Sequence, residues 1–294
     1  MSKVLIEIVS NSIGDTIAAL PYIERYSKDN DVDVVVSINP SLIPLFVDKY
    51  QSIQLQGRTI SGSFSKIFHL EYDFNSSVQG GYAKQLGYEN PEYIRPKLTA
   101  PKLPRPIKGK YVTIGIHSTS QLKYWNHPTG KGAQKLSPNW AELCAIIRKA
   151  GYTPVVVEQH EMFGQAPNFN GMPAKAQVKL GNMQQSLNLI NHSEFYIGLS
   201  SGMAWAAHAM GKKVAMIANF TEDWNEFDLN LPDYKRIVNK AVCHGCWNRI
   251  KLDFPFDAED WYWCPKHKDT ERQFECHTSI TPEMVHAQIK EWLV

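Results

Sequence analysis

The 294-residue sequence predicts an α/β protein built from two Rossmann-like lobes that face each other across a cleft. Three observations support this fold class. Short apolar runs alternate with segments whose apolar residues recur at helical spacing, which is the pattern of parallel sheets covered by helices. A proline-rich stretch at 96–109 interrupts this alternation, which then starts again. The length also exceeds what one hydrophobic core usually accommodates and suits two lobes.

Apolar runs in the first third of the chain predict the strands of one sheet. A helix is expected after the first run, because Ile13, Ile17, Leu20 and Ile23 recur at helical spacing. The expected strands are Lys3–Ile8, Val32–Val36 and Lys66–Leu70, and a second helix is expected over Pro40–Tyr50.

The stretch at 96–109 alternates prolines with lysines and arginines, which predicts an extended and fairly stiff linker. Beyond it, Ser137 and Pro138 have the residue types of a helix start, and Gly151 has that of a helix end. The further expected strands are Tyr111–His117, Thr153–Val157, Phe195–Gly198 and Lys213–Ile217, and the further helices are Gln184–Asn191, Gly202–Met210 and the segment from Thr281 to the C-terminus.

The composition is that of a globular protein, with 43% hydrophobic and 20% charged residues. A net charge of only +2 argues against a generally nucleic-acid-binding surface. The sequence has no run of about 18 apolar residues, so no membrane-spanning helix is predicted. Its apolar N-terminal stretch lacks a signal-peptide cleavage site. We therefore expect a cytoplasmic protein that has no membrane partner.

The motif Ser12-Ile-Gly-Asp15 follows the first predicted strand. Gly14 is expected to let the backbone turn tightly out of that strand. Asp15 would then lie at a helix N-terminus, at the carboxyl end of the sheet, where open α/β proteins bind their ligands. An aspartate there either caps the free amides of the helix or acts as an acid or base in the cleft. Spacing alone leaves both interpretations open, capping being the commoner role.

A second turn, Gly198-Leu-Ser-Ser-Gly-Met203, joins a predicted strand to a predicted helix. Small residues at a helix start expose backbone N–H groups, and the helix dipole adds partial positive charge, so the turn predicts a phosphate site. Ser200 and Ser201 offer hydroxyl donors, and Gly202 allows a ligand to approach closely. The alternative is an ordinary capped helix.

A third polar loop follows the strand expected at 111–117. Ser118 and Thr119 offer hydroxyl donors, and Lys123 offers a mobile positive charge, so the loop is suited to hold a diphosphate. The alternative is a polar loop with a solvated lysine. Its expected position opposite Asp15 favours the diphosphate.

Four of the five cysteines, Cys243, Cys246, Cys264 and Cys276, fall within one C-terminal stretch, whereas Cys144 fits an apolar helical pattern. Clustered cysteines in a reducing cytoplasm bind metal more often than they form disulfides. The Cys-x-x-Cys pair forms half of a tetrahedral thiolate site, and the two later cysteines complete it. Soft sulfur ligands suit zinc or iron.

Two disulfides or four unrelated thiols are the alternatives to this metal site. His244, His267 and His277 lie close in sequence as substitute ligands, although four thiolates leave no vacancy. We expect the metal to have a structural role, because a closed four-thiolate site contributes folding free energy and has no open position for catalysis.

Taken together, these residues resemble bacterial ADP-heptose glycosyltransferases. The likeness lies in Ser12–Asp15 with Pro21 and in the strand-turn-helix Gly198–Ala207. Within that family the sequence is most similar to the autotransporter heptosyltransferases, in Ser118–Asn126, Gly198–Trp205, Cys243–Cys246, Trp263–Pro265 and Phe274–Cys276. Trp205 replaces the histidine usual in the wider family. The resemblance covers nearly the whole chain.

The resemblance implies a GT-B fold with the donor between the lobes. Asp15 would be the general base, Lys123 the partner of the diphosphate, and Ser201–Met203 the phosphate-binding helix start. It also implies an iron or zinc ion on the four cysteines, ADP-heptose or another nucleotide sugar as donor, and a protein hydroxyl as acceptor. The sugar-transfer chemistry itself would use no metal.

The expected organisation follows from the same likeness. The expected segments are an N-terminal acceptor lobe (1–95), a linker (96–109), a nucleotide-sugar lobe (110–240), a four-cysteine metal-binding segment (241–278) and a C-terminal helix (279–294). Autotransporter enzymes carry a further N-terminal region for assembly and substrate binding, whereas the first predicted strand here begins at Lys3. We therefore leave oligomerisation and the acceptor open.

Three other functions remain at this stage. The chain could glycosylate another acceptor, such as a modified DNA base. It could be a nucleotide-sugar epimerase, which would consume its substrate without an acceptor. It could also be a non-enzymatic, metal-stabilised nucleic-acid-binding module, in which basic residues contact phosphates. That last function would leave the cleft motifs unexplained.

Overall fold

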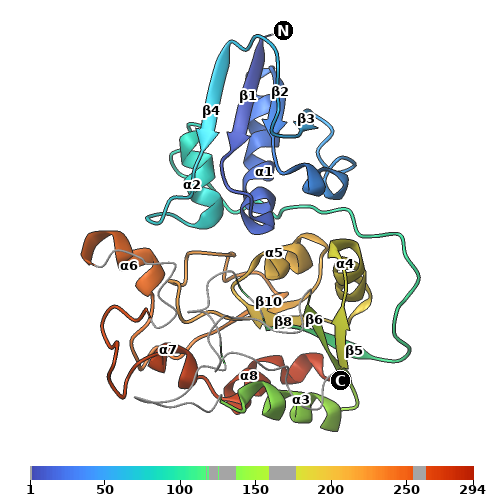
Figure 1. Cartoon of the computed structure of the whole chain (residues 1–294), viewed down its shortest axis with the longest axis vertical. Coiled ribbons are helices and arrows are strands. Elements are labelled where there is room, and N and C mark those ends of the chain that lie inside the picture. Colours follow the sequence, from blue (N-terminus) through green and yellow to red (C-terminus); the bar gives the residue numbers. More distant parts are fainter. Residues whose placement is uncertain (1, 117, 119–124, 126–136, 159–176, 254–262) are drawn as a thin grey trace.

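The computed structural model describes residues 2–116, 118, 125, 137–158, 177–253 and 263–294. Within these residues the chain forms two parallel sheets, one of four strands in the order β3-β2-β1-β4 and one of six in the order β10-β9-β8-β5-β6-β7. Figure 1 shows them stacked along the long axis of the molecule. The predicted fold class, two Rossmann-like lobes, is thereby confirmed.

The N-terminal lobe is built around β1, which is paired in parallel with β2 on one side and β4 on the other. The predicted helix over 40–50 is a short 3-10 helix instead, because Pro44 lies inside it and lacks the N–H needed to continue. Its elements are β1 (Lys3–Ile8), α1 (Ile13–Asn30), β2 (Asp33–Ser37), the 3-10 helix (Pro40–Leu45), β3 (Ile53–Gln56), β4 (Lys66–Leu70) and α2 (Val78–Gln85).

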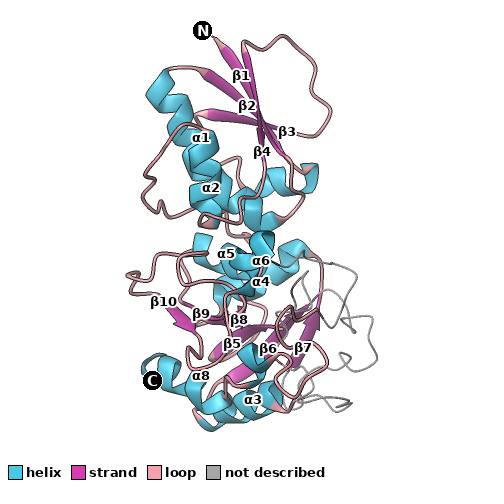
Figure 2. Ribbon diagram, turned by 90° about the vertical axis from the view of Figure 1, so that its left-hand side faces the viewer, coloured by secondary structure: helices cyan, strands magenta, loops and turns pink. Residues whose placement is uncertain are grey.

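The C-terminal lobe has helices on both faces of its sheet (Figure 2). Helices α3 and α8 contact each other on one face, and α4 and α5 contact each other on the other. Its elements are β5 (Tyr111–Gly115), α3 (Asn139–Lys149), β6 (Thr153–Glu158), β7 (Gln177–Leu180), α4 (Met183–His192), β8 (Tyr196–Leu199), α5 (Gly202–Ala209), β9 (Val214–Ile217), β10 (Tyr234–Ile237), α6 (Cys246–Asp253), α7 (Glu275–Thr278), α8 (Pro282–Ile289) and a 3-10 turn (Lys290–Trp292).

The two lobes share one hydrophobic core. Buried side chains of α1, among them Ile17 and Leu20, belong to the same cluster as Ala204 and Trp205 of α5. The relative position of the lobes is therefore set by apolar packing, and not by the chain connection alone. The segment boundaries predicted from the sequence stay predictions. Among the described residues, none of the helices combines the length and apolar character needed to cross a bilayer.

The predicted linker at 96–109 runs along the C-terminal lobe. The Leu98 amide donates to the Ala209 carbonyl at 3.2 Å, and the Asn188 side-chain amide donates to the Pro104 carbonyl at 3.0 Å. These bonds satisfy backbone groups that a proline-rich strand cannot pair within itself. They attach the linker to the back of α5 and to α4.

A fully buried histidine lies beneath the contact between the lobes. His208, in the last turn of α5, stacks on Phe227 with ring centroids 4.3 Å apart. Neither ring nitrogen has a hydrogen-bond partner among the described residues. Burial, with repulsion from Arg95, lowers the pKa of His208 to about 4. The imidazole is therefore neutral in the folded protein.

This low pKa predicts a loss of stability in acid. In the unfolded chain the histidine binds its proton near its ordinary pKa of about 6.5, so folding stability is intact above that value and falls as the pH drops toward about 4. In urea unfolding between pH 7 and pH 4.5, His208→Leu should remove up to about 1.4 kcal/mol of this loss per pH unit. Equal pH dependence in both proteins would contradict the assignment.

Candidate active site between the lobes and cysteine cluster

Asp15 lies in the first turn of α1, at the end of the loop that follows β1. Its carboxylate accepts a hydrogen bond from the Ser10 hydroxyl at 2.5 Å, and the same hydroxyl oxygen accepts from the Ser12 amide at 3.1 Å. The N-cap position of α1 is occupied by Ser12, so Asp15 is not the capping residue. The side chain is partly exposed, and the positive end of the helix dipole favours its ionised form.

Arg58 holds the backbone of this loop from outside. Its guanidinium donates to the carbonyls of Ile8, at 2.5 Å, and Ser10, at 3.0 Å, and to the side-chain oxygen of Asn11, at 2.8 Å. The loop that carries the Asp15 carboxylate is therefore fixed by a side chain that comes from beyond β3. The sequence gives no signal for this role, because an arginine in a polar segment is most often solvated.

The starts of α1 and α5 touch each other. A Cβ atom placed on Gly14 would lie 3.3 Å from the Gly202 Cα and 3.4 Å from a ring carbon of Trp205. A Cβ on Gly202 would overlap the Ile13 side chain and lie 3.2 Å from the Gly14 nitrogen. Gly14 is a helical residue without positive φ, so the predicted tight turn is wrong. Gly202 leaves no space for a Cβ unless Ile13 moves, whereas a Cβ at Gly14 would be tight, because two backbones approach here.

The start of α5 presents the groups expected of an anion site. Ser201 is its N-cap residue in an extended conformation and makes no side-chain cap. The Ser201 hydroxyl is buried and has no hydrogen-bond partner among the described residues. Gly202 and Met203 follow, with amides at the positive end of the helix. Hydrogen-bond donors suited to an anion therefore lie at the point where α5 meets α1.

The Ser200 hydroxyl points into the protein instead. It donates to the buried carboxylate of Glu226 at 2.5 Å, which uses its only proton. We therefore assign Ser200 a structural role and keep Ser201, Gly202 and Met203 for a phosphate. The Ser118 hydroxyl donates to the Ser200 carbonyl at 3.4 Å, so Ser118 lies beside the same turn. Thr119 and Lys123 lie outside the described residues.

Glu226 forms a buried ion pair with Arg236. Arg236 donates to it at 2.5 Å and also donates to the carbonyls of Ala218 and Thr221, both at 2.6 Å. The two charged side chains are only 1% and 3% exposed. Because a buried carboxylate and guanidinium are costly unless fully hydrogen-bonded, the network holds the loop after β9 in one conformation. Sequence reasoning missed it.

The four clustered cysteines lie in the C-terminal part of the chain, after β10. Burial raises the pKa of Cys246 to about 12, and the neighbouring thiols of Cys243 and Cys264 add to the effect. Burial raises the pKa of Cys276 as well, and the thiols of Cys246, Cys264 and Cys243 add to this effect. The four thiols are thus close enough to influence one another electrostatically, but among the described residues the group of ligand atoms that all lie within 4.8 Å of one another is that of Cys243, His267 and Glu275 and not that of the four cysteines. Phe220, Trp263 and Phe274 form a small apolar cluster against them.

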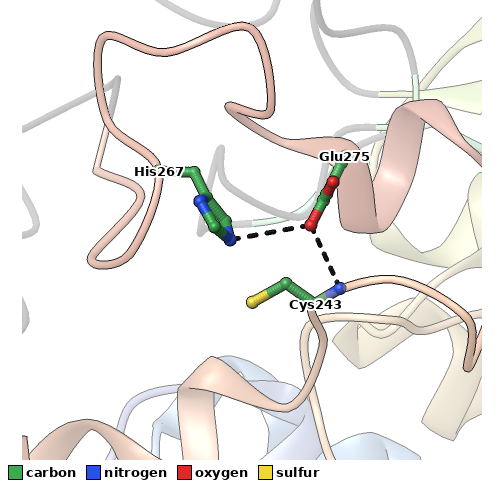
Figure 3. A group of neighbouring side chains, drawn as sticks. All are labelled: Cys243, His267 and Glu275. Atoms are coloured by element: carbon green, nitrogen blue, oxygen red, sulfur yellow. Dashed lines mark hydrogen bonds and ion pairs between the residues drawn. The ribbon is translucent and has the colours of Figure 1, made fainter.

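A histidine and a carboxylate accompany the first cysteine (Figure 3). Ligand atoms of Cys243, His267 and Glu275 all lie within 4.8 Å of one another. One Glu275 oxygen accepts from the Cys243 amide at 3.2 Å, and Arg272 donates to that oxygen at 2.6 Å. His267 was considered from the sequence, but Glu275 was not. A thiol, an imidazole and a carboxylate so close together fit a zinc or iron ion.

No protein-family model matches the chain. The autotransporter heptosyltransferase TibC of Escherichia coli O78:H11 is 31% identical over 307 residues, which cover 98% of this chain and 71% of that protein. The autotransporter heptosyltransferase BAHTCr of Citrobacter rodentium is also 31% identical, with 97% of this chain and 70% of that protein covered. A solved structure, dodecameric iron-containing TibC in complex with ADP-D-beta-D-heptose, is similar with a TM-score of 0.85 and 27% identity, covering 99% of this chain and 76% of that one.

The contact between α1 and α5 predicts that Gly202 tolerates no side chain. In Gly202→Ala the added methyl group must push Ile13 and the first turn of α1 away. We expect the free energy of unfolding to fall by about 1–3 kcal/mol, the usual cost of overpacking. ADP affinity should fall too, because the displaced helix start carries the expected phosphate donors. Urea unfolding and calorimetric ADP titration measure both, and an unchanged result in both would refute the contact.

Proposed function

The chain belongs to the autotransporter heptosyltransferase family, a family of GT-B glycosyltransferases, and on that basis we propose that it transfers heptose from ADP-heptose to a hydroxyl group of a protein acceptor. One observation carries the proposal furthest. The Asp15 carboxylate belongs to the N-terminal lobe, and the start of α5, which is suited to bind a phosphate, belongs to the C-terminal lobe. The two helix starts meet at Gly14 and Gly202. A sugar-phosphate bond and its attacking hydroxyl both fit at such a junction.

In the proposed reaction, Asp15 accepts the proton of the acceptor hydroxyl as its oxygen bonds to the anomeric carbon of the donor. The bond from that carbon to the diphosphate breaks, and ADP leaves with an added negative charge. The Ser201 hydroxyl and the amides of Gly202 and Met203 stabilise this charge, with Lys123 and Thr119 completing the phosphate contacts. The Ser118 hydroxyl, like that of Ser200, already donates its proton within the protein. An aspartate is a weak base, so its proton transfer comes late, when the anomeric carbon is already cationic.

We propose that Cys243, Cys246, Cys264 and Cys276 hold one iron or zinc ion. The electrostatic influence of the four thiols on one another and the packing of Cys246 and Cys264 against one apolar cluster support this, as does the iron-containing relative. A bound metal would neutralise thiolates that burial disfavours and would supply folding free energy to a segment with a small apolar cluster. Its role is structural, and the sugar-transfer step passes through the chain's own groups between the lobes.

Two wider properties follow from the same basis. We propose a cytoplasmic location, because a thiolate metal site is maintained in a reducing compartment. We also propose that the chain assembles into oligomers, as its dodecameric relative does.

Asp15→Asn tests the base. The amide keeps the shape and a hydrogen bond to Ser10 but cannot take up a proton, so the transfer rate should fall about a hundredfold or more. ADP affinity and thermal stability should stay close to wild type. The measurement is transfer of heptose from ADP-heptose to an acceptor protein, followed by mass spectrometry. Exposed Asp48, changed to Asn, is the matched control and should transfer normally.

An Asp15→Asn enzyme that turns over at the wild-type rate would remove Asp15 from the mechanism. Donor consumption in the absence of any acceptor would instead indicate an epimerase or a hydrolase.

Cys243→Ser tests the metal site. Elemental analysis of the wild-type protein should find about one iron or zinc per chain, the stoichiometry of one four-thiolate site. The variant should lose most of that metal and unfold at lower temperature, while any folded fraction still binds ADP. Cys144→Ala is the control, since this buried cysteine should affect stability without changing metal content. Metal-free protein that is equally stable but inactive would make the ion catalytic.

A further inference from the structure

The side chains of the two residues that follow Cys246 contact the N-terminal lobe. Helix α6 begins at this cysteine and lies below α2 in Figure 1. The Trp247 indole N–H donates to the Tyr72 hydroxyl at 2.8 Å, and the Asn248 side-chain amide donates to the Phe74 carbonyl at 3.1 Å. Both acceptors lie in the connection between β4 and α2. Two consecutive side chains of the cysteine segment thus bind the other lobe.

Asn225 closes this arrangement from the loop after β9. Its side-chain oxygen accepts from the Tyr72 hydroxyl at 3.3 Å and from Asn248 at 2.8 Å, and its backbone carbonyl accepts from the Val78 amide at 2.8 Å. Asn225 and Asn248 are only 2% and 8% exposed. We call the six residues Tyr72, Phe74, Val78, Asn225, Trp247 and Asn248 the interlobe clasp. Such buried, mutually satisfied polar groups have one preferred arrangement.

Aromatic packing joins the clasp to the cysteine cluster. The Trp247 ring lies 5.0 Å from the Phe74 ring on one side and 5.4 Å from the Phe220 ring on the other. Phe220 in turn packs on Trp263, next to Cys264. Trp247 therefore connects the aromatic residues of the cysteine segment directly to Phe74 of the N-terminal lobe.

The other end of the clasp leads to the helix that carries the candidate base, because Val78 begins α2 and α2 packs against α1. Burial raises the pKa of Tyr72, and the carboxylates of Glu226 and Asp15 add to this effect. Tyr82 of α2 experiences the Asp15 charge in the same way. Both phenols therefore remain neutral beside the aspartate, and Tyr72 is fixed there by its two hydrogen bonds to the C-terminal lobe.

We propose that Trp247 and Asn248 are positioning residues for sugar transfer, which hold the connection between β4 and α2 against the C-terminal lobe and so fix Asp15 and its tyrosine neighbours over the donor. The effect on turnover rests on the proposed function, whereas the clasp itself does not. The clasp gives the cysteine segment a role at the cleft without any metal contact to substrate. It also lies at a second point of contact between the lobes, apart from the glycines.

The test uses the full-length, metal-loaded protein and Trp247→Phe, which keeps the aromatic packing but removes the N–H donor. Hydrogen–deuterium exchange of amides 71–79, which include Val78, should become about tenfold faster, the scale of one lost buried hydrogen bond. Exchange in β1 and β2 should stay unchanged. The rate constant kcat for heptose transfer should fall by a similar factor, with ADP affinity and metal content within about twofold of wild type.

Tyr72→Phe removes the partner of the same bond and should produce the same pattern. Because Tyr72→Phe also removes the bond to Asn225, the double variant should be no worse than Tyr72→Phe alone, since the bond between Trp247 and Tyr72 is lost only once. Tyr152→Phe is the matched control. It removes a hydroxyl that donates at 2.6 Å to the Val294 carbonyl, far from the cleft, and should leave amides 71–79 and kcat unchanged.

Unchanged exchange of amides 71–79 in Trp247→Phe would overturn the clasp. Faster exchange with an unchanged kcat would overturn its positioning role. A wild-type protein that transfers no heptose would instead contradict the proposed function, and the exchange measurement would still decide whether the clasp exists.

Discussion

The close contact between the first turns of α1 and α5 is the constraint on which the rest of the structure depends. Two helices, one from each lobe, meet where a Cβ at Gly202 would overlap Ile13 and a Cβ at Gly14 would lie 3.3 Å from the Gly202 Cα. The apolar faces behind this contact form one core across both lobes. The contact therefore places the helix turn that carries Asp15 beside the start of α5, where the Ser201 hydroxyl has no partner among the described residues; neither lobe could achieve this alone.

Rigid support surrounds this junction on each side. Arg58 and Ser10 fix the loop that carries Asp15, and the buried pair of Glu226 and Arg236 fixes the loops beneath α5. Groups that act on a developing charge are effective when they are already in place, because no reorganisation is needed during the reaction. The supporting network serves that requirement. The cysteine segment adds a further attachment between the lobes at Trp247.

The sequence predicted the sheet architecture well where apolar runs are strong. The predicted bounds of β1 and β4 are those observed, because both are short, mainly apolar stretches. The prediction from the sequence failed where a local preference is overridden by contacts with residues far away in the chain. Pro44 limits the predicted second helix, and β3 is too short and polar to be distinguished from a loop. Gly14 was predicted to make a turn but instead makes room for another backbone.

Side-chain partners at the site were the least predictable part. Ser200 looked equivalent to Ser201, yet it faces Glu226, which lies 26 residues further along the chain. Tyr72 and Trp247 are 175 residues apart. No periodicity or spacing in a single sequence reports such pairs, because the fold must be known before they meet. The cysteine cluster was predictable only because a metal site leaves a compositional signal that a hydrogen bond does not.

A crystal structure of the protein with ADP-heptose would test the central claim most directly. We expect the diphosphate to lie at the start of α5, in contact with the Ser201 hydroxyl and the amides of Gly202 and Met203. The Asp15 carboxylate should face the side of the anomeric carbon opposite the diphosphate, with space between them for a hydroxyl group. A diphosphate bound elsewhere, or a donor whose anomeric carbon is turned away from Asp15, would contradict the account.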